Sequence, residues 1–289
     1  MVFKLILSSK YPYALAETLY SGQAFRWDPI LNGEAHEGIL DGVRVRLSQK
    51  EDGIHFSSES GDSFDVGFIK KYLRLEDDLQ LIYSQLSSDT YFTQAKDLYE
   101  GLHILRQDPW ECLVTFICSA NNNIPRIKSL VKGLSETCGE RIRDQFGYFY
   151  SFPEPVSISE IGELGLRKIG LGFRAKYVAK VAESVVRDEI DLKSFRFLEY
   201  QEALTELLKF PGVGDKVANC VLLFSMDKLQ AFPVDVWIKR VLRENYLNDA
   251  DESIPDTKLR DWAQIHFGEF AGYANQYLFH QRRLIQHRN

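Results

Sequence analysis

The segment Leu207–Ala218 constrains the fold of this chain more than any other. Its sequence is Leu-Leu-Lys-Phe-Pro-Gly-Val-Gly-Asp-Lys-Val-Ala. A helix should end near Phe210, because a proline disfavours helical backbone at the residue before it. Gly212 and Gly214 then permit a tight turn with unusual backbone angles. Since apolar residues recur at helical spacing on either side, the segment predicts a helix, a short hairpin and a second helix over about 199–226.

Such a hairpin is suited to binding the phosphates of a nucleic acid. Glycine lets the backbone approach a ligand closely, and the free amides and dipole at the start of the second helix favour an anion. The candidate phosphate contacts are Gly212, Gly214 and Val217. The alternative is an ordinary helical hairpin with structural glycines. The pattern GxxxxGK[ST] is absent from the sequence, so a nucleotide-phosphate loop of that kind is excluded.

Charge and composition give weaker constraints. The 289 residues include 35 Lys and Arg against 41 Asp and Glu, a net charge of −6, whereas nucleic-acid-binding domains are usually basic. The local arrangement of amides and cations matters more than this total. The four cysteines show no CxxC spacing, which favours free thiols in a reducing cytosol over a zinc site. Neither a signal peptide nor a run of about 20 apolar residues occurs, so we expect a cytoplasmic protein without a membrane segment.

The pattern along the chain predicts an α+β fold. Residues 1 to about 60 are typical of short strands separated by turns, including strands at 2–7, 24–27 and 43–47. After residue 76 the spacing becomes helical. We therefore expect an N-terminal antiparallel β domain at 1–90, followed by a mainly helical catalytic region at 91–289. The expected helices lie near 79–86, 109–118, 123–137, 173–188, 199–209, 215–226, 235–246, 256–267 and 271–287.

Lys216 and Asp235 are the candidate catalytic pair. Lys216 lies at the start of the second predicted helix, and Asp235 follows it by 19 residues, within the proline-containing loop 232–237. A deprotonated lysine can act as a nucleophile and form a Schiff base. A carboxylate nearby can stabilise a developing positive charge or move protons. An Asp at a helix N-terminus should also stay ionised at neutral pH. The simpler alternative is a surface lysine and an ordinary helix N-cap.

The string PGVGxKxA, followed by the loop and Asp235, resembles the helix-hairpin-helix superfamily of DNA glycosylases. Three further strings narrow the resemblance to the 8-oxoguanine DNA glycosylases, in a prokaryotic branch of the eukaryotic-type family. They are Ser21–Trp27 (SGQAFRW), Ile117–Arg126 (ICSANNNIPR) and Leu166–Ala175 (LRKIGLGFRA). The resemblance implies a bifunctional enzyme, in which the Lys216 amine would attack C1′ of the sugar once the base departs and form a Schiff base, with Asp235 stabilising the charge on the sugar. The enzyme would remove 8-oxoguanine, preferably opposite cytosine, and nick the strand by β-elimination. Removal of other oxidised or alkylated purines and a non-catalytic DNA-binding module are the alternatives.

The resemblance also implies a pocket for the flipped base. The backbone carbonyl of Gly22 would accept a hydrogen bond from N7–H of 8-oxoguanine, which guanine lacks. Cys220 and Phe279 would lie against the two faces of the base. Asn275 matches the base-recognising glutamine of the family and Gln276 stands next to it, so either amide is a candidate. For the cysteine and the phenylalanine, ordinary core packing is the alternative.

On the opposite strand, the resemblance implies that Asn121 fills the space left by the flipped base. Arg126 and Arg174 would bond the orphaned cytosine, while phosphate contacts or solvated charges are the alternatives. Phe173 stands where eukaryotic members have a tyrosine wedge. Trp237 stands where they have a histidine near a phosphate.

The remaining expectations concern cofactors and partners. The partner is double-stranded DNA containing oxidised guanine, bound by a monomer. An iron–sulfur cluster needs four clustered cysteines near the C-terminus, whereas the last cysteine here is Cys220, so none is expected. By family analogy alone, the carbonyls of Leu208, Phe210 and Val213 would bind a monovalent cation at the hairpin.

Overall fold

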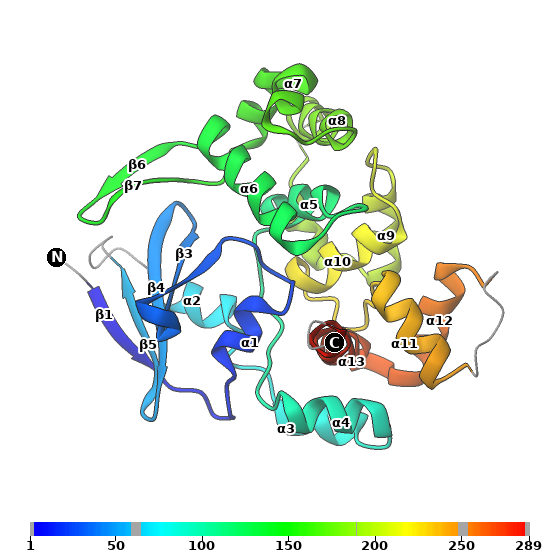
Figure 1. Cartoon of the computed structure of the whole chain (residues 1–289). Coiled ribbons are helices and arrows are strands. Elements are labelled where there is room, and N and C mark those ends of the chain that lie inside the picture. Colours follow the sequence, from blue (N-terminus) through cyan, green and yellow to red (C-terminus); the bar gives the residue numbers. More distant parts are fainter. Residues whose placement is uncertain (1–2, 59–64, 189, 248–253, 287–289) are drawn as a thin grey trace.

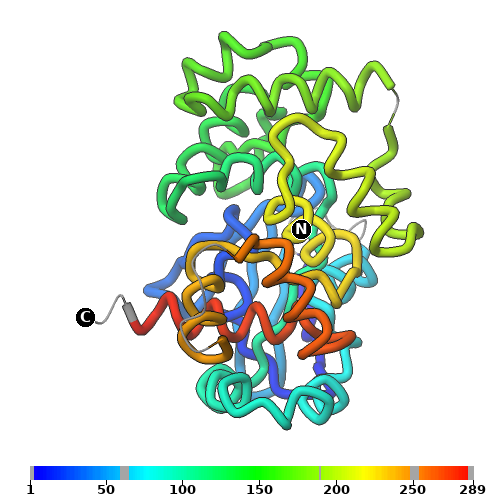
Figure 2. The backbone as a smooth tube through the Cα atoms, turned by 90° about the vertical axis from the view of Figure 1, so that its right-hand side faces the viewer, coloured from blue at the N-terminus to red at the C-terminus, as the bar shows by residue number. Residues whose placement is uncertain are grey.

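The structure is a computed structural model that describes residues 3–58, 65–188, 190–247 and 254–286. An antiparallel sheet packs beside a larger helical body (Figure 1), which confirms the predicted α+β class. Figure 2 shows the α6–α8 segment (green) at one end of the molecule and α3 and α4 (cyan) at the other, with the C-terminal helix α13 (red) between them. Within the described ranges, no helix is long and apolar enough to cross a membrane.

The N-terminal sheet has five antiparallel strands in the order β1-β5-β4-β3-β2. Asp41 and Gly42 join β3 to β4 and have φ values of 49° and 70°. Two consecutive residues in this left-handed region form the tight turn that matches the twist of a β-hairpin, as the Asp-Gly pair predicts. The strands are β1 (Phe3–Leu7), β2 (Trp27–Ile30), β3 (Ala35–Leu40), β4 (Val43–Lys50) and β5 (Gly53–Ser58).

The strand predicted at 24–27 is wrong, because β2 begins only at Trp27. The cause is the buried side chain of Gln23. Its amide nitrogen donates to the carbonyls of Thr18 and His103, both at 2.8 Å, and its oxygen accepts from the Leu105 amide at 2.7 Å. These bonds hold the segment before β2 in an irregular loop. The helix α1 (Leu15–Tyr20) also replaces part of the region that was predicted to be strands.

Nine predicted helices are confirmed to within one or two residues at each end. Aspartate N-caps begin several helices; Asp108, for example, accepts hydrogen bonds from the Trp110 and Glu111 amides in front of α5, with Pro109 as the first helical residue. The nine are α3 (Leu79–Leu86), α5 (Pro109–Cys118), α6 (Ile124–Cys138), α8 (Arg174–Arg187), α9 (Tyr200–Leu208), α10 (Asp215–Ser225), α11 (Val236–Asn245), α12 (Asp256–Phe267) and α13 (Ala271–Gln286). Elements that were not predicted are α2 (Val66–Tyr72), α4 (Thr90–Leu98), α7 (Pro155–Ile169) and the hairpin of β6 (Arg141–Asp144) and β7 (Gly147–Tyr150).

The buried apolar side chains form two clusters. One lies between the sheet and helices α1 and α2, around Trp27, Leu47 and Phe56. The other fills the helical body and includes Leu79 of α3 and Phe92 of α4. Helices α3 and α4 thus pack with the helical body, although α3 precedes residue 90 in the sequence. The domain boundary at residue 90 stays a prediction.

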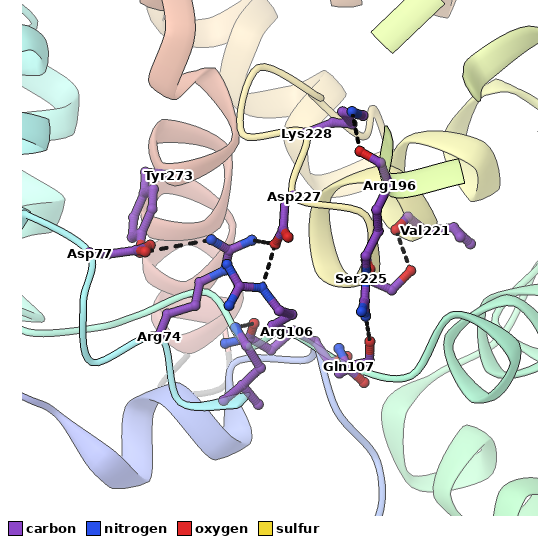
Figure 3. A network of polar contacts seen from close by, with 12 residues as sticks. Arg74, Asp77, Arg106, Gln107, Arg196, Val221, Ser225, Asp227, Lys228 and Tyr273 are labelled. Atoms are coloured by element: carbon purple, nitrogen blue, oxygen red, sulfur yellow. Dashed lines mark hydrogen bonds and ion pairs between the residues drawn. The ribbon is translucent and has the colours of Figure 1, made fainter. Parts of the chain in front are cut away.

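A partly buried polar network joins the two parts (Figure 3). Asp227, in the turn after α10, forms ion pairs with Arg74 and, at 2.7 Å, with Arg106. The Tyr273 hydroxyl of α13 donates to Asp77 at 2.6 Å. Burial would raise the pKa of Asp227, but the charges of the two arginines outweigh it and lower the pKa. This network fixes α10 and α13 relative to the N-terminal part of the chain.

Candidate active site

The hairpin between α9 and α10 has the predicted form, with one difference. Gly212 has φ of +81°, and a Cβ atom there would lie 2.4 Å from the Tyr177 ring, so only glycine fits. Gly214 is extended, with φ of −96° and ψ of −178°, so its predicted unusual backbone angle is wrong. A Cβ on Gly214 would meet open space, which leaves its backbone accessible. Val217 is buried, so only its amide can face a phosphate.

Lys216 lies in the first turn of α10 and is half-buried. Its ammonium donates to the Ser119 hydroxyl at 2.9 Å and lies 5.1 Å from the centre of the Phe116 ring. Ser119 in turn donates to the Phe116 carbonyl at 2.7 Å. No role was predicted for Ser119. No local signal marks it, because the contact joins residues 97 positions apart.

Asp235 is the N-cap of α11, as the simpler reading predicted, and its position also suits catalysis. One carboxylate oxygen accepts from the Trp237 amide at 3.0 Å and from the Ile238 amide at 2.9 Å. Burial raises the pKa of Asp235 above 3.8, although the Ile238 amide, the Lys216 charge and the Trp237 amide oppose the rise. The effect of the Lys216 charge on this pKa means that the two predicted catalytic groups lie within electrostatic range of each other. The ionisation of Asp235 at neutral pH stays a prediction.

Cys220 lies one turn after Lys216 on α10 and is buried. Burial raises the pKa of its thiol to about 11, although the Lys216 charge opposes this rise. The group is therefore a neutral thiol at neutral pH, which suits packing against an uncharged ring. Lys216, Asp235 and Cys220 form one cluster.

Gly22 and the ring of Phe279, two residues assigned to the predicted base pocket, lie close together. Gly22 has φ of +83°, and a Cβ there would lie 3.0 Å from the Phe279 ring and 3.2 Å from Ile124. The left-handed backbone and the close contact both require glycine. The first segment of the chain and its last helix thus meet at this point.

The side-chain nitrogens of Asn275 and Gln276 bond to main-chain carbonyls. Asn275 donates to the Pro233 carbonyl at 2.9 Å, in the loop before Asp235. Gln276 donates to the Ser21 carbonyl at 3.0 Å, next to Gly22. Both residues are buried. The choice between them as the base-recognising amide stays a prediction.

The α5–α6 turn and the α7–α8 turn are bonded to each other. Asn121 is exposed with φ of 48°. Arg174 donates to the Ala120 carbonyl through Nε at 2.9 Å and to the Asn121 carbonyl through Nη2 at 2.9 Å. Arg126 is exposed and donates to the Gly170 carbonyl at 3.0 Å. The structure therefore brings the predicted opposite-strand residues together. Phe173 is 49% exposed, and the Arg174 guanidinium lies 4.5 Å from the centre of its ring.

Two remaining candidates lie near the starts of α10 and α11. Trp237 is half-buried in the first turn of α11, and Arg240 lies 5.4 Å from the centre of its ring.

At the hairpin, the Phe210 carbonyl accepts from the Val213 amide at 3.1 Å. A carbonyl oxygen has two lone pairs, so this bond leaves one for a cation. The cation site at Leu208, Phe210 and Val213 stays a prediction.

Comparison with known proteins identifies the family. Residues 5–113 match the family described as "8-oxoguanine DNA glycosylase, N-terminal domain". Residues 114–264 match the "HhH-GPD superfamily base excision DNA repair protein" family. The N-glycosylase/DNA lyase OGG1 of Arabidopsis thaliana is 34% identical over 277 residues, covering 91% of this chain and 75% of that protein.

Solved structures agree with the sequence relatives. The apo form of Clostridium acetobutylicum 8-oxoguanine glycosylase/lyase is 34% identical with a TM-score of 0.89, covering 96% of this chain and 95% of that one. Its complex with double-stranded DNA containing cytosine opposite 8-oxoG is 33% identical with a TM-score of 0.89, covering 98% of each chain. The chain therefore belongs to the 8-oxoguanine DNA glycosylase family, a group of N-glycosylase/DNA lyases within the HhH-GPD superfamily of base excision repair enzymes.

Proposed function

We propose that this chain removes 8-oxoguanine from duplex DNA, preferably opposite cytosine, and then nicks the strand, with Lys216 as nucleophile. One observation carries the assignment of the nucleophile. Lys216 is the half-buried amine in the first turn after the hairpin, oriented by Ser119 and within the electrostatic reach of Asp235. A lysine that served only to bind phosphate would need neither of these partners.

The chemistry follows from this cluster. The bond between the base and C1′ breaks, and the base leaves with the electron pair and takes up a proton. Asp235 stabilises the positive charge that the sugar develops. The deprotonated Lys216 amine then attacks C1′ and forms a Schiff base as the sugar ring opens. Loss of a proton from C2′ expels the 3′ phosphate, and water hydrolyses the Schiff base to free the lysine.

In this proposal DNA is bound by the N-terminal ends of α10 and α11 and by the α5–α6 and α7–α8 turns. The exposed backbone of Gly212 and Gly214 and the Val217 amide would contact phosphates, with Trp237 beside them. Asn121 would occupy the vacated space, with Phe173 inserted next to it. The complex of the Clostridium relative with a cytosine-containing lesion duplex supports cytosine as the opposite base.

The test is covalent trapping. The protein is incubated with an 8-oxoguanine:cytosine duplex and borohydride, and the adduct is resolved by size. The wild type should form the adduct and Lys216→Gln should not. Lys209→Gln is the matched control, because Lys209 is exposed on the same hairpin and pairs only locally with Glu206. An undiminished adduct with Lys216→Gln would exclude the assigned nucleophile.

The remaining parts of the proposal are a monomeric state, a cytoplasmic location at the chromosome and a monovalent cation at the hairpin. The four cysteines are free, which supports a reducing compartment. The proposed chemistry requires no residue of a second subunit, because one chain supplies Lys216, Asp235 and the candidate pocket residues. Sedimentation of the protein with and without a lesion duplex would test the monomer directly.

A further inference from the structure

The last helix holds the Gly22 segment through two side chains. Gln276 donates to the Ser21 carbonyl at 3.0 Å. Arg283 donates through Nη2 to the Tyr20 carbonyl at 2.7 Å. The two carbonyls immediately before Gly22 are therefore both bonded to α13.

The other side of Gly22 is held as well. The Gln23 carbonyl accepts from the Gln107 side chain at 2.7 Å. The Gln23 side chain is fixed by the Thr18 and His103 carbonyls. Among the hydrogen bonds of the described residues, none ends on the Gly22 carbonyl. In the described part of the chain this carbonyl thus has no donor, and it lies between neighbours whose positions are fixed.

The contacts of α13 follow the spacing of one helix face. Gln276, Phe279 and Arg283 are three and four residues apart, so they lie along one side of the helix. Phe279 touches Gly22, and the Arg283 guanidinium lies 6.0 Å from the centre of the Phe279 ring. Asn275, beside them, bonds the loop that leads to the catalytic carboxylate. One helix therefore positions both the base pocket and the catalytic loop.

Arg283 makes these contacts from a half-buried position. Burial lowers the pKa of its guanidinium, and its Nε atom is buried without a hydrogen-bond partner among the described residues. Its polar contacts are the Tyr20 carbonyl and, at 3.3 Å, the His280 ring. Within the same residues, no carboxylate forms an ion pair with it. A partly desolvated charge without a counter-ion is unfavourable. The hydrogen bond to the Tyr20 carbonyl is therefore the main interaction that stabilises the guanidinium in this position.

We propose that Arg283 and Gln276 are positioning residues that fix the Gly22 carbonyl and thereby support recognition and excision of 8-oxoguanine. The inference rests on the proposed function. The carbonyl can accept a hydrogen bond from N7–H of 8-oxoguanine, whereas N7 of guanine is itself an acceptor and repels it. A displaced carbonyl loses both the attraction and the repulsion. Base excision should therefore suffer, while nicking of a site that has already lost its base should not.

The experiment compares two substrates under single-turnover conditions: an 8-oxoguanine:cytosine duplex and the same duplex with an abasic site opposite cytosine. Arg283→Met should lower excision about tenfold, the effect of one lost hydrogen bond, and change abasic nicking less than twofold. Arg283→Lys keeps a donor for the Tyr20 carbonyl and should recover most of the excision. The matched control is Arg282→Met, because Arg282 pairs instead with Glu244 at 2.7 Å. Thermal unfolding checks that each variant is folded.

Gln276→Leu is the second variant, since it removes the donor to the Ser21 carbonyl. It should also lower the rate of excision relative to the rate of abasic-site nicking. Equal loss of excision and nicking in the folded Arg283→Met protein would overturn the inference. Wild-type rates of both excision and nicking would overturn it as well. Failure of the proposed function has a different signature. In that case the wild type itself would not excise 8-oxoguanine.

Discussion

The ammonium group of Lys216 donates a 2.9 Å hydrogen bond to the hydroxyl of Ser119, which ties the first turn of α10 to the end of α5. Ser119 is itself fixed, since it donates to the Phe116 carbonyl. Because the single hydroxyl proton of Ser119 is donated to Phe116, its oxygen faces Lys216 as an acceptor. An ammonium group and a neutral amine both carry N–H donors, so this contact can orient Lys216 in either protonation state.

Ser119→Ala should slow borohydride trapping on an 8-oxoguanine duplex about tenfold, because one hydrogen bond that orients the amine is worth about 1–1.5 kcal/mol. DNA affinity should stay within twofold. Ser129→Ala, at an exposed position on α6, is the control. Trapping at the wild-type rate in Ser119→Ala would show that the hydroxyl does not orient Lys216.

Asp235 has two roles that two substitutions separate. Asn is nearly as good an N-cap as Asp, so Asp235→Asn should retain stability but lower excision by about two orders of magnitude, since the carboxylate charge is lost. Asp235→Ala should lose the same activity and also about 1 kcal/mol of unfolding free energy. Single-turnover rates and urea denaturation measure the two effects. Equal activity of Asp235→Asn and wild type would rule out the electrostatic role.

The pH dependence follows from the same residue. Burial raises the folded-state pKa of Asp235 above its unfolded value. The folded state therefore binds the proton more tightly, and the contribution of this group to stability falls as pH rises from the unfolded pKa through the folded one. Activity has the opposite trend, because it needs the ionised carboxylate. The rate should fall on acidification through the raised pKa, and this limb should be absent from Asp235→Asn.

The two hairpin glycines should respond differently to alanine. Gly212→Ala places an alanine in a left-handed backbone conformation and brings its Cβ into a clash with the Tyr177 ring. It should therefore cost about 2 kcal/mol of unfolding free energy. Gly214→Ala fits an extended backbone with open space beside it, so stability should change by less than about 0.5 kcal/mol. Its added methyl should instead weaken DNA binding by obstructing close approach of a phosphate. Urea denaturation and fluorescence anisotropy with a lesion duplex distinguish these outcomes.

The sequence predicted the hairpin and most helices because each leaves a local signal: proline and glycine at a turn, Asp before a helix, apolar residues at helical spacing. The catalytic roles of Lys216 and Asp235 stay a prediction. It did not predict the irregular loop before β2, because the bonds of Gln23 to His103 and Leu105 span about 80 residues. The contacts of Ser119 and Arg283 are non-local in the same way. The structure also showed that Gly214 needs no special backbone angle, which its residue type alone could not indicate.

Arg126 and Arg174 were predicted as an equivalent pair, but their surroundings differ. Arg126→Ala should leave stability nearly unchanged and reduce the preference for cytosine, because this side chain is exposed and makes one bond to Gly170. Arg174→Ala should lower excision opposite all four bases, because Arg174 holds the carbonyls of Ala120 and Asn121. Excision from duplexes with C, A, G and T opposite the lesion gives both results. A uniform loss in Arg126→Ala would contradict its assignment to the opposite base.

The ion pairs of Asp227 in the polar network should make the free energy of unfolding decrease at low pH. Asp227→Asn removes the partner of Arg74, which is 3% exposed, and of Arg106. The loss should be about 2 kcal/mol, between the values for exposed and for buried ion pairs. The folded pKa of Asp227 lies below its unfolded value, so its contribution is present above the unfolded pKa and is lost as pH falls through the folded one. Urea denaturation of wild type and variant should therefore differ at pH 7 and converge on acidification. Asp97→Asn is the control and should show little difference at either pH, because Asp97 is exposed where it pairs with Lys96.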